Sequence, residues 1–457
     1  MWASAQACFD SLKSSKATPA SSTQRAPIRF FDDQPYSRYI REQLENKDDD
    51  EGSGRKMFRP TYVAIGPRFH REDDLKQGQE WKRVAAWDFW EYSDQPFTAL
   101  FKRVEEVADQ ARNCYSSTAT AGFTDDDFTT MMFVDGCFLL QLIVMCAANF
   151  GNGGLIPVGS DGRDYNFGSA LSQIESDTLL YDVFMVENQI PWVILRALMS
   201  IRPVHVMHFV DMVVAYYFDT QAAARPADHH LSANDYQPIH LLDLLCKRQI
   251  GGQASSAFTM DELFTNTQLE AVTLTSATQL LETGVCICPS RTPRFADIDF
   301  SSRQCSPFGQ LSLPPIVLRH TTLGLLLNML AFELLYPDND TRSNVAGYLG
   351  MLSALMSREE DVRQLRRKGI IQTTLDDMEV IRLLRKLEPH TNGNKAELTT
   401  YLVRAKINGF FKKWGIWIEF HRFVYKNLKF LIAIGSFLSV SLSILKAILA
   451  LPAGSSK

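Results

Sequence analysis

Four titratable side chains are the strongest candidates for chemistry in this 457-residue chain. Asp135 lies in the apolar run VDGCF and Glu187 in VENQIPW, so both carboxylates are expected to be buried. A buried carboxylate needs a partner, and two carboxylates that share a site could act as general acid and base. His205 and His208 are three residues apart and fall on one helical face. Chemistry requires at least two of these four groups to converge in a pocket.

Each carboxylate also has a structural explanation, which we favour. In VDGCF, Gly136 permits close packing, so Asp135 is expected to make a polar contact within the core. In VENQIPW, Pro191 cannot continue a preceding helix but suits the first turn of a new one. The polar residues 187–189 before it can satisfy the backbone groups left open at such a junction. The motif therefore predicts a corner between two helices.

Metal binding has weak support in the sequence. His205, His208 and Asp211 could supply two nitrogens and an oxygen, but they also fit the polar face of an amphipathic helix, which we favour. Cys286 and Cys288 form a lone C-x-C with no second pair at zinc-site spacing. The eight cysteines are scattered and are expected to be reduced and buried. We therefore expect neither a metal nor a cofactor.

Familiar catalytic signatures are missing from the chain. It contains no phosphate-binding loop, no nucleophile elbow, no H-E-x-x-H pair, no kinase signature and no dinucleotide-binding G-x-G-x-x-G. The balance of 47 Lys and Arg against 52 Asp and Glu gives no attraction to nucleic acid. We therefore expect a protein that is not an enzyme and does not bind nucleic acid.

The elements that must position these residues are mostly helices. Residues 1–56 are rich in Ser, Thr, Gln and charge and are expected to be a disordered tail, followed by a helical domain over 57–400. Helical periodicity is found over 128–148, 177–186, 191–200, 204–217, 240–246, 260–281 and 322–335. Ser357 and Thr374 begin capping-box patterns, and Gly369 after LRRK predicts a helix end. The fold class is predicted to be mainly α.

A short β-hairpin is expected to interrupt the helices. Ala296, Ile298 and Phe300 alternate with two aspartates, and the turn-rich SSRQCSPFG follows. QLSLPP then resumes the alternation until two prolines end it. These residues predict one pair of antiparallel strands.

The C-terminal apolar run predicts a single-pass transmembrane helix over 430–451. A helix of that length spans about 33 Å, enough to cross a hydrocarbon core of about 30 Å. Lys446 interrupts the run, but it lies near Leu451, where its side chain could reach the interface. The alternative is a buried C-terminal helix of the body, because the stretch before Lys446 is slightly short for a membrane.

A basic, aromatic segment over 401–429 precedes this run. Between Arg404 and Lys429 it has seven Lys or Arg and one acidic residue, Glu419. This composition favours a juxtamembrane helix, because aromatic rings prefer the headgroup layer and cations prefer anionic lipids; an aromatic core helix is the alternative. The positive charge places the body in the cytosol, at the plasma membrane or an endomembrane, with a short tail, 452–457, on the other side.

An ordered series of motifs resembles one known family. The series is RPTYVAIGPRFH (59–70), EWKR (80–83), FTTMMFVDGCFLLQLI (128–143), DVFMVENQIPWVIL (182–195), HLLDLL (240–245), SATQLLETGV (276–285), ADIDF with LSLPPIVL, and NMLAFE (328–333). It is similar to the plant family called domain of unknown function 247, over roughly residues 57–451. The resemblance implies a mostly helical body, a C-terminal membrane helix and no established catalytic activity or cofactor. It also implies recognition or signalling at a membrane, since some grass members are implicated in self-incompatibility.

The chain departs from the usual family pattern at several positions. Residues 65–71 replace a usual IGPYHHG, Gln141 replaces a glutamate and Trp192 a phenylalanine. The role of one member therefore does not transfer directly to this chain. We expect a membrane-anchored protein that acts through an unidentified protein partner.

The alternative function comes from a different class. It is an unrecognised enzyme or small-molecule binder whose pocket uses the buried Asp135, Glu187 or the pair His205 and His208. Convergence of these groups in the structure decides between the two.

Overall fold

The computed structural model describes residues 28–30, 58–149, 166–171, 174–218, 237–250, 276–302, 308–336, 344–391 and 398–449. Within these ranges the protein is mainly helical with short strands, as predicted. The elements in chain order are η2 (Asp73–Leu75), α3 (Lys76–Glu91), α4 (Phe97–Glu105), α5 (Ala108–Arg112), α6 (Ser117–Thr120), α7 (Asp125–Asn149), α8 (Asn166–Leu171), α9 (Ser176–Val183), α10 (Trp192–Met199), α11 (Val206–Phe218), α12 (Leu241–Ile250), α14 (Ala277–Glu282), β1 (Val285–Pro289), β2 (Asp299–Ser302), β3 (Gly309–Leu313), β4 (Ile316–Leu318), α15 (His320–Leu335), α16 (Asn344–Leu355), α17 (Glu359–Arg367), β5 (Ile371–Thr373), α18 (Asp377–Thr391) and α19 (Leu398–Leu449).

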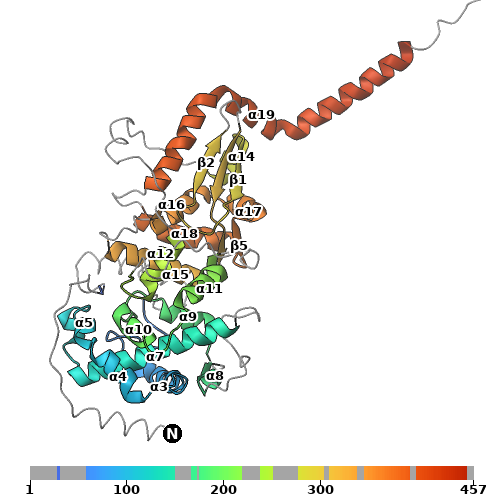
Figure 1. The fold of residues 1–457 in the computed structure, drawn as a ribbon. Coiled ribbons are helices and arrows are strands. Elements are labelled where there is room, and N and C mark those ends of the chain that lie inside the picture. Colours follow the sequence, from blue (N-terminus) through green and yellow to red (C-terminus); the bar gives the residue numbers. More distant parts are fainter. Residues whose placement is uncertain are drawn as a thin grey trace, which may run out of the picture.

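The elements stack along one long axis, roughly in the order of the sequence (Figure 1). Helices α3, α4, α5 and α7 form one end, α9 to α12 with α15 lie in the middle, and the strands with α14 and α16 to α18 form the other end. One continuous hydrophobic core, from Ile28 to Ile418, runs through all three parts. The body therefore has one main core, and Ala64, Phe69 and Leu75 form a small separate cluster.

The helix α7 is the centre of the first end. It packs against α3, α4, α5, α10 and α11, and most of its side chains are buried. The backbone N–H of Asp127 donates to Thr124 Oγ1 at 3.1 Å, so the acidic residues that begin α7 belong to a capped helix start. Gly136 faces α10, where an added Cβ would lie 2.7 Å from Leu198 Cδ1, which confirms the predicted close packing.

The predicted hairpin is confirmed and is part of a larger sheet. The strands β2 and β3 are antiparallel, with Phe300 opposite Leu311. The strand β1 lies on the other side of β3 and is parallel to it, and β4 pairs with β5 in a separate parallel sheet. Parallel pairs join segments that are distant in the sequence, so no local turn signal predicts them.

Two of the three helix-boundary signals are shifted. The helix α17 begins at Glu359, and Asp361 Oδ2 accepts from the backbone N–H of Arg358 at 3.0 Å, so the helix start lies one residue after the predicted Ser357. The helix α18 begins at Asp377, the last residue of the pattern that starts at Thr374. Gly369 has a φ of 73° just after α17, which confirms the predicted helix end.

The prediction of a disordered tail over 1–56 is wrong for residues 28–30. Ile28 is 1% exposed and Phe30 is 3% exposed, and both belong to the main core. Their partners lie far along the chain, so the composition of the surrounding segment, rich in Ser and charge, hides the contact. The remaining residues of the predicted tail lie outside the described residues, as do residues 260–275 of the predicted helix 260–281.

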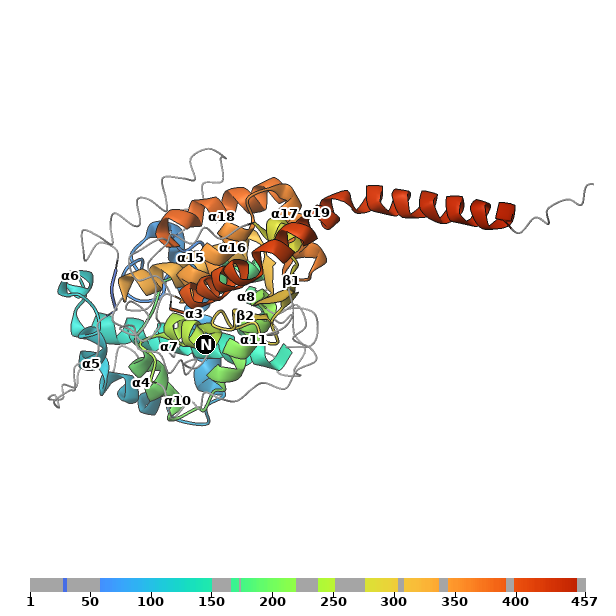
Figure 2. The same cartoon turned by 90° about the horizontal axis from the view of Figure 1, so that it is seen from above.

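A single helix, α19, covers both C-terminal segments that the sequence separates. It is interrupted at Trp414, whose φ of −111° and ψ of 18° are not helical. Before this residue, Val403, Ile407 and Phe410 are buried against the body, so the predicted boundary at residue 400 falls within a helix and the first part of 401–429 is a core helix. After it, Ile418 is still buried in the core, and only the following part of α19 runs away from the body (Figures 1 and 2).

Replacing Gly78 tests the packing of α3. An alanine Cβ at this position would collide with the backbone oxygen of Tyr62, which cannot rotate away. We expect Gly78→Ala to lower the free energy of unfolding by about 1–3 kcal/mol, measured by denaturant unfolding of the detergent-solubilised chain. The matched control is Gly409→Ala, where no atom lies within 4 Å of the new Cβ. Because alanine favours helix, that variant should gain up to about 1 kcal/mol, and equal effects would contradict the packing.

Candidate functional site

Asp135 is enclosed in the core and paired with Lys82. Both side chains are fully buried, and Lys82 Nζ from α3 lies 2.5 Å from Asp135 Oδ1 on α7. The ammonium also donates to the carbonyl oxygen of Ala64 at 2.6 Å, and the backbone N–H of Gly66 donates to Asp135 Oδ2 at 2.7 Å. Both carboxylate oxygens therefore have partners within the protein, which confirms the core polar contact predicted for Asp135.

The segment 61–66, which contacts this pair, is irregular and is not paired with any strand of the described residues. Its backbone is paired by side chains instead. Asp182 on α9 accepts hydrogen bonds from the backbone N–H groups of Thr61, Tyr62 and Val63 at 2.9, 2.6 and 3.1 Å. Asn188 accepts from the N–H of Ile65 at 2.7 Å and donates to the oxygen of Val63 at 2.9 Å. Buried backbone groups require such partners, so these two side chains replace a neighbouring strand.

The corner predicted for VENQIPW joins α9 to α10. Asn188 Nδ2 donates to the carbonyl oxygen of Asp182, and Gln189 Nε2 donates to those of Val183 and Met185, all at 2.8–2.9 Å. These oxygens lie at the end of α9, where helical partners are missing. Gln189 Oε1 also accepts from the N–H of Leu242 on α12 at 3.2 Å, so the corner connects three helices.

Gly66 is required by both its backbone conformation and its surroundings. Its φ is 78°, in the left-handed region that favours glycine. An added Cβ would lie 2.7 Å from the carbonyl oxygen of Gln189, which also accepts a hydrogen bond from Tyr115 Oη at 2.9 Å. No other residue type fits this position without moving the corner.

Asn328 and Glu333 of the motif NMLAFE bind backbone groups in the same way. Asn328 Oδ1 accepts from the N–H of Val186 in the corner at 2.9 Å. The two oxygens of Glu333 accept from the N–H groups of Val345 and Ala346 at 2.8 and 3.1 Å. Those groups belong to the first turn of α16, where a carboxylate is favourable.

His240 is a fully buried side chain between α12 and α15. Its Nδ1 accepts from the N–H of Asp243 at 3.2 Å, and its ring lies 5.3 Å from that of Phe332 and 6.2 Å from that of Tyr336. Burial lowers its pKa from 6.5 to about 3, because the charged form cannot be solvated there. The imidazole is therefore neutral at physiological pH.

Side chains from five of the quoted motifs thus form one buried set, which we call the motif network. Its members are Lys82, Asp135, Asp182, Asn188, Gln189, His240 and Asn328. Apart from the Lys82–Asp135 pair, the hydrogen bonds of these side chains go mainly to the backbone of the protein itself. The motif network therefore stabilises the packing of the middle of the body and is not an open binding site.

The other residues that the sequence singles out, Glu187, His205, His208 and Asp211, are not members of the motif network. Glu187 is fully buried, whereas His205 and His208 are exposed beside and on α11. Asp211 pairs with the guanidinium Nε of Arg248. Across the described ranges, no group of three or more His, Cys, Asp and Glu side chains is arranged to hold a metal ion. The histidines therefore do not share the enclosed environment of the two carboxylates.

The cysteines divide into buried and accessible thiols. Cys137, Cys146 and Cys246 are buried, as predicted, and burial raises the pKa of Cys146 to about 12. Cys286 is exposed and Cys288 is half-buried on β1, contrary to the expectation of buried thiols. Alternation along an edge strand explains the difference.

Gln141, one of the departures from the family pattern, is fully buried on α7. Its Oε1 accepts from Arg202 Nη1 at 3.0 Å, and the same guanidinium lies over the ring of Phe89. A neutral amide thus makes the contact to arginine that a carboxylate would make as an ion pair. Trp192, another departure, is half-buried against the core, and its backbone N–H donates to the carbonyl oxygen of Ile239 at 2.8 Å.

The partners Lys82, Asp182 and Asn328 were given no role by the sequence reasoning. A signal for Lys82 was available, because Gly78, Ala85 and Phe89 place it on the buried face of α3. A lysine on such a face requires an anion, and Asp135 is the buried aspartate of the neighbouring helix.

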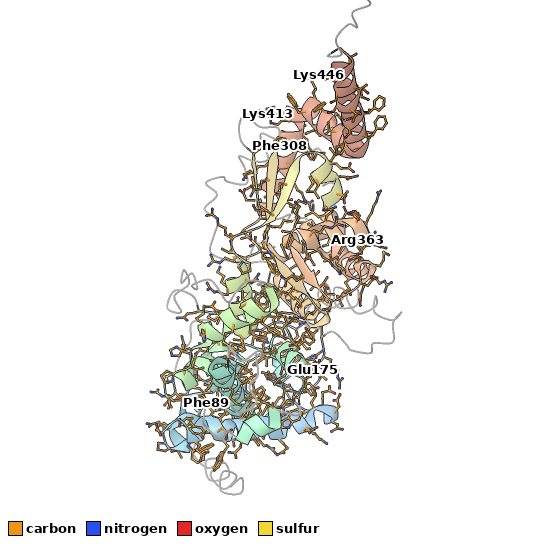
Figure 3. The ribbon with its side chains drawn as sticks, turned by 90° about the vertical axis from the view of Figure 1, so that its right-hand side faces the viewer. Phe89, Glu175, Phe308, Arg363, Lys413 and Lys446 are labelled. Atoms are coloured by element: carbon orange, nitrogen blue, oxygen red, sulfur yellow. The ribbon has the colours of Figure 1, made fainter. Side chains whose placement is uncertain are left out.

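Apart from the buried motif network, the other feature that could carry a function is the exposed surface of α19 after Trp414. Among the described residues, every exposed large hydrophobic side chain except Phe308 and Met378 lies there. The exposed side chains, which we call the α19 apolar surface, are Ile416, Trp417, Phe420, Phe423, Leu428, Phe430, Leu431, Ile432, Ile434, Phe437, Leu438, Val440, Leu442, Ile444 and Leu445. Figure 3 shows this surface extending from near Lys413, beside the sheet, to Lys446.

A double-mutant cycle tests the Lys82–Asp135 pair. We expect Lys82→Met to lower the free energy of unfolding by about 3–5 kcal/mol, since it leaves a buried carboxylate without its cation. Asp135→Asn should cost a similar amount, and the double variant should lose clearly less than the sum of the two. The control is the exposed pair Lys406–Asp299, where Lys406→Met should cost no more than about 1 kcal/mol. Strict additivity in denaturant unfolding would rule out the buried pair.

The pH dependence of stability tests the neutral state of His240. Its folded pKa lies below the unfolded value of 6.5, so its contribution is complete above that pH and is lost as the pH falls toward 3. We expect His240→Gln to reduce the slope of the unfolding free energy between pH 4 and 6 by up to about 1.4 kcal/mol per pH unit. Parallel curves for wild type and His240→Gln would contradict a buried neutral ring.

Comparison with known proteins identifies the chain's relatives. The sequence profile of domain of unknown function 247 (DUF247), described as a plant protein of unknown function, matches residues 48–442. UPF0481 protein At3g47200 of Arabidopsis thaliana is 25% identical over 388 residues, which cover 80% of this chain and 76% of the relative. UPF0481 protein At3g02645 of the same plant is 20% identical over 415 residues, covering 70% and 72%. No solved structure matches. The chain therefore belongs to the DUF247 family of plant proteins.

Proposed function

We propose that this protein is anchored in a membrane by the C-terminal part of α19 and acts there, without catalysis, by recognising another protein. The observation that carries the anchor is the α19 apolar surface, on which Ile416 is 89% and Phe437 72% exposed. Each Å² of apolar surface left in water costs about 25 cal/mol, and soluble monomers rarely expose so long a patch. A helix satisfies its own backbone groups, so hydrocarbon is a suitable solvent for this surface.

Two helices compete for the role of membrane span. By length and composition, Asp125–Ala147 is the one helix of the described residues that could cross a membrane, but 78% of its most apolar window is buried in the body. It is therefore a core helix. The stretch Phe430–Lys446 is apolar but shorter, and α19 continues to Leu449. From Phe430 to Leu449 the helix is about 30 Å long, which matches the hydrocarbon core.

The charges near Trp414 support a cytosolic body. Lys413 lies with its ammonium 5.5 Å from the ring centroid of Trp414, and Arg422 pairs with Glu419 at 2.7 Å. Cations on the body side of an apolar run favour that side as cytosolic. The anionic lipids of that leaflet would attract them further.

The recognition role is supported by the motif network. Its polar side chains bind the backbone of the protein itself, and Asp135, the best acid candidate, is already neutralised by Lys82. A rigid body fixed beside a membrane suits binding of a partner rather than turnover of a substrate.

Charged substitutions test the anchor. We expect the double variant Ile434→Asp and Leu438→Asp to move from the membrane fraction to the soluble fraction of plant cells, because each charge at mid-bilayer costs about 2.5–3.5 kcal/mol. The control Lys446→Leu should stay in the membrane fraction after a carbonate wash. Retention of the double variant in that fraction would argue against the anchor.

Protease treatment of the same cells reports the side of the body. A tag at the N-terminus should be digested only after the plasma membrane is permeabilised. Digestion in intact cells would place the body outside the cell. That result would contradict the proposed cytosolic orientation but not the membrane anchor.

A further inference from the structure

The short segment Ile28–Phe30 is held on the body like a bound peptide. Ile28 and Phe30 are buried, and the backbone N–H of Ile28 donates to the carbonyl oxygen of Cys114, just after α5. The backbone N–H of Arg29 donates to Tyr336 Oη at 2.8 Å. A main-chain contact on each side thus fixes the direction of the segment.

The side chain of Arg29 is recognised at the end of α15. Its Nη1 donates to the carbonyl oxygen of Leu335 at 2.7 Å, and its guanidinium carbon lies 5.2 Å from the ring centroid of Tyr336. The last carbonyl groups of a helix have no helical partner and attract a cation. Stacking of the guanidinium on tyrosine adds to this preference.

Phe30 contacts one aromatic ring and one guanidinium group. Its ring stacks on Tyr115 with centroids 6.1 Å apart and planes 17° apart, and the guanidinium of Arg68 lies 5.9 Å from its centroid. Arg68 is one of the positions where the chain departs from the family pattern, so this contact is a feature of this chain. We call Arg68, Cys114, Tyr115, Leu335 and Tyr336 the Ile28–Phe30 seat.

The seat is held in place by the motif network. Tyr115 Oη donates to the carbonyl oxygen of Gln189, and the ring of Tyr336 packs against that of His240. Both tyrosines are therefore positioned by contacts that do not involve residues 28–30. A preformed seat of this kind loses little entropy when it binds a ligand.

We propose that the seat is a recognition site for a peptide of a partner protein carrying an aliphatic residue, an arginine and an aromatic residue in succession. Residues 28–30 occupy it in the chain's own resting state. The contacts that fix the three residues come from their own atoms, so the same sequence on another chain can make them. The inference rests on the proposed recognition function and names the class of its partner. Because residues 28–30 are tethered to the seat, they compete for it at an effective concentration on the order of mM. A partner peptide therefore displaces them only if it binds the seat more tightly or is present at a high local concentration.

Peptide binding to the full chain in lipid nanodiscs tests the proposal. The probe is a fluorescein-labelled peptide of residues 24–34, QRAPIRFFDDQ, followed by fluorescence anisotropy. The double variant Ile28→Asp and Phe30→Asp empties the seat without altering its residues. We expect this variant to bind the probe at least about tenfold more tightly than wild type, because the tethered competitor is gone. A control peptide with Glu in place of Arg29 should bind neither protein.

A substitution in the seat adds a second readout. Tyr336→Phe, made in the double variant, keeps the ring but removes the oxygen that accepts from Arg29, and should weaken probe binding several-fold. Unchanged affinity would show that the probe binds elsewhere and would overturn the proposal. Absence of binding to a double variant with a native circular dichroism spectrum would overturn it too, as would equal binding to wild type.

A milder variant covers the possibility that the two aspartates unfold the chain. Arg29→Ala keeps both buried apolar side chains and should raise probe affinity about threefold over wild type, since only the cation contacts of the competitor are lost. If the folded Arg29→Ala variant binds the probe no more tightly than wild type, displacement of residues 28–30 by a partner peptide is refuted. These outcomes are independent of membrane fractionation, so a failure of the seat is distinguishable from a failure of the anchor.

Discussion

The middle of the body depends on a cation and an anion that are both removed from water. Lys82 and Asp135 join α3 to α7, and their remaining hydrogen-bonding capacity fixes Ala64 and Gly66 in the segment 61–66 before α3. Neither charge would be tolerated alone, because desolvation costs several kcal/mol per ion. The segment, in turn, is the surface on which the α9–α10 corner rests, through Asp182 and Asn188. Loss of one charge would therefore loosen elements that touch neither side chain.

Much of this arrangement could be predicted from the sequence. The helical class, the helix α7, the β2–β3 hairpin, the proline corner and the burial of Asp135 follow from local periodicity and from the cost of burying polar groups. Partners across long sequence distances could not be predicted, because no local pattern encodes them. The strand β1, the role of Asp182 and the docking of residues 28–30 are of this kind.

The C-terminal segment shows how composition can mislead about boundaries. Its basic and aromatic residues look uniform from 401 to 429, yet Phe410 packs on Phe300 of β2 whereas Phe420 and Phe423 are exposed. The change of surroundings occurs at Trp414, where the backbone leaves helical geometry. Packing against a specific neighbour, rather than hydrophobicity, decides which aromatic rings belong to the body.

The interruption at Trp414 has a mechanical consequence. The part of α19 before it is attached to the sheet by Phe410 on Phe300 and by Lys406 on Asp299. After it, Ile418 is still buried in the core, whereas the α19 apolar surface is exposed. In the proposed membrane-anchored state, this one non-helical residue sets the angle between the part of α19 that packs on the body and the part that enters the bilayer. That angle determines how far from the membrane the opposite end of the elongated body lies. Trp414 therefore sets the orientation of the body relative to the proposed bilayer.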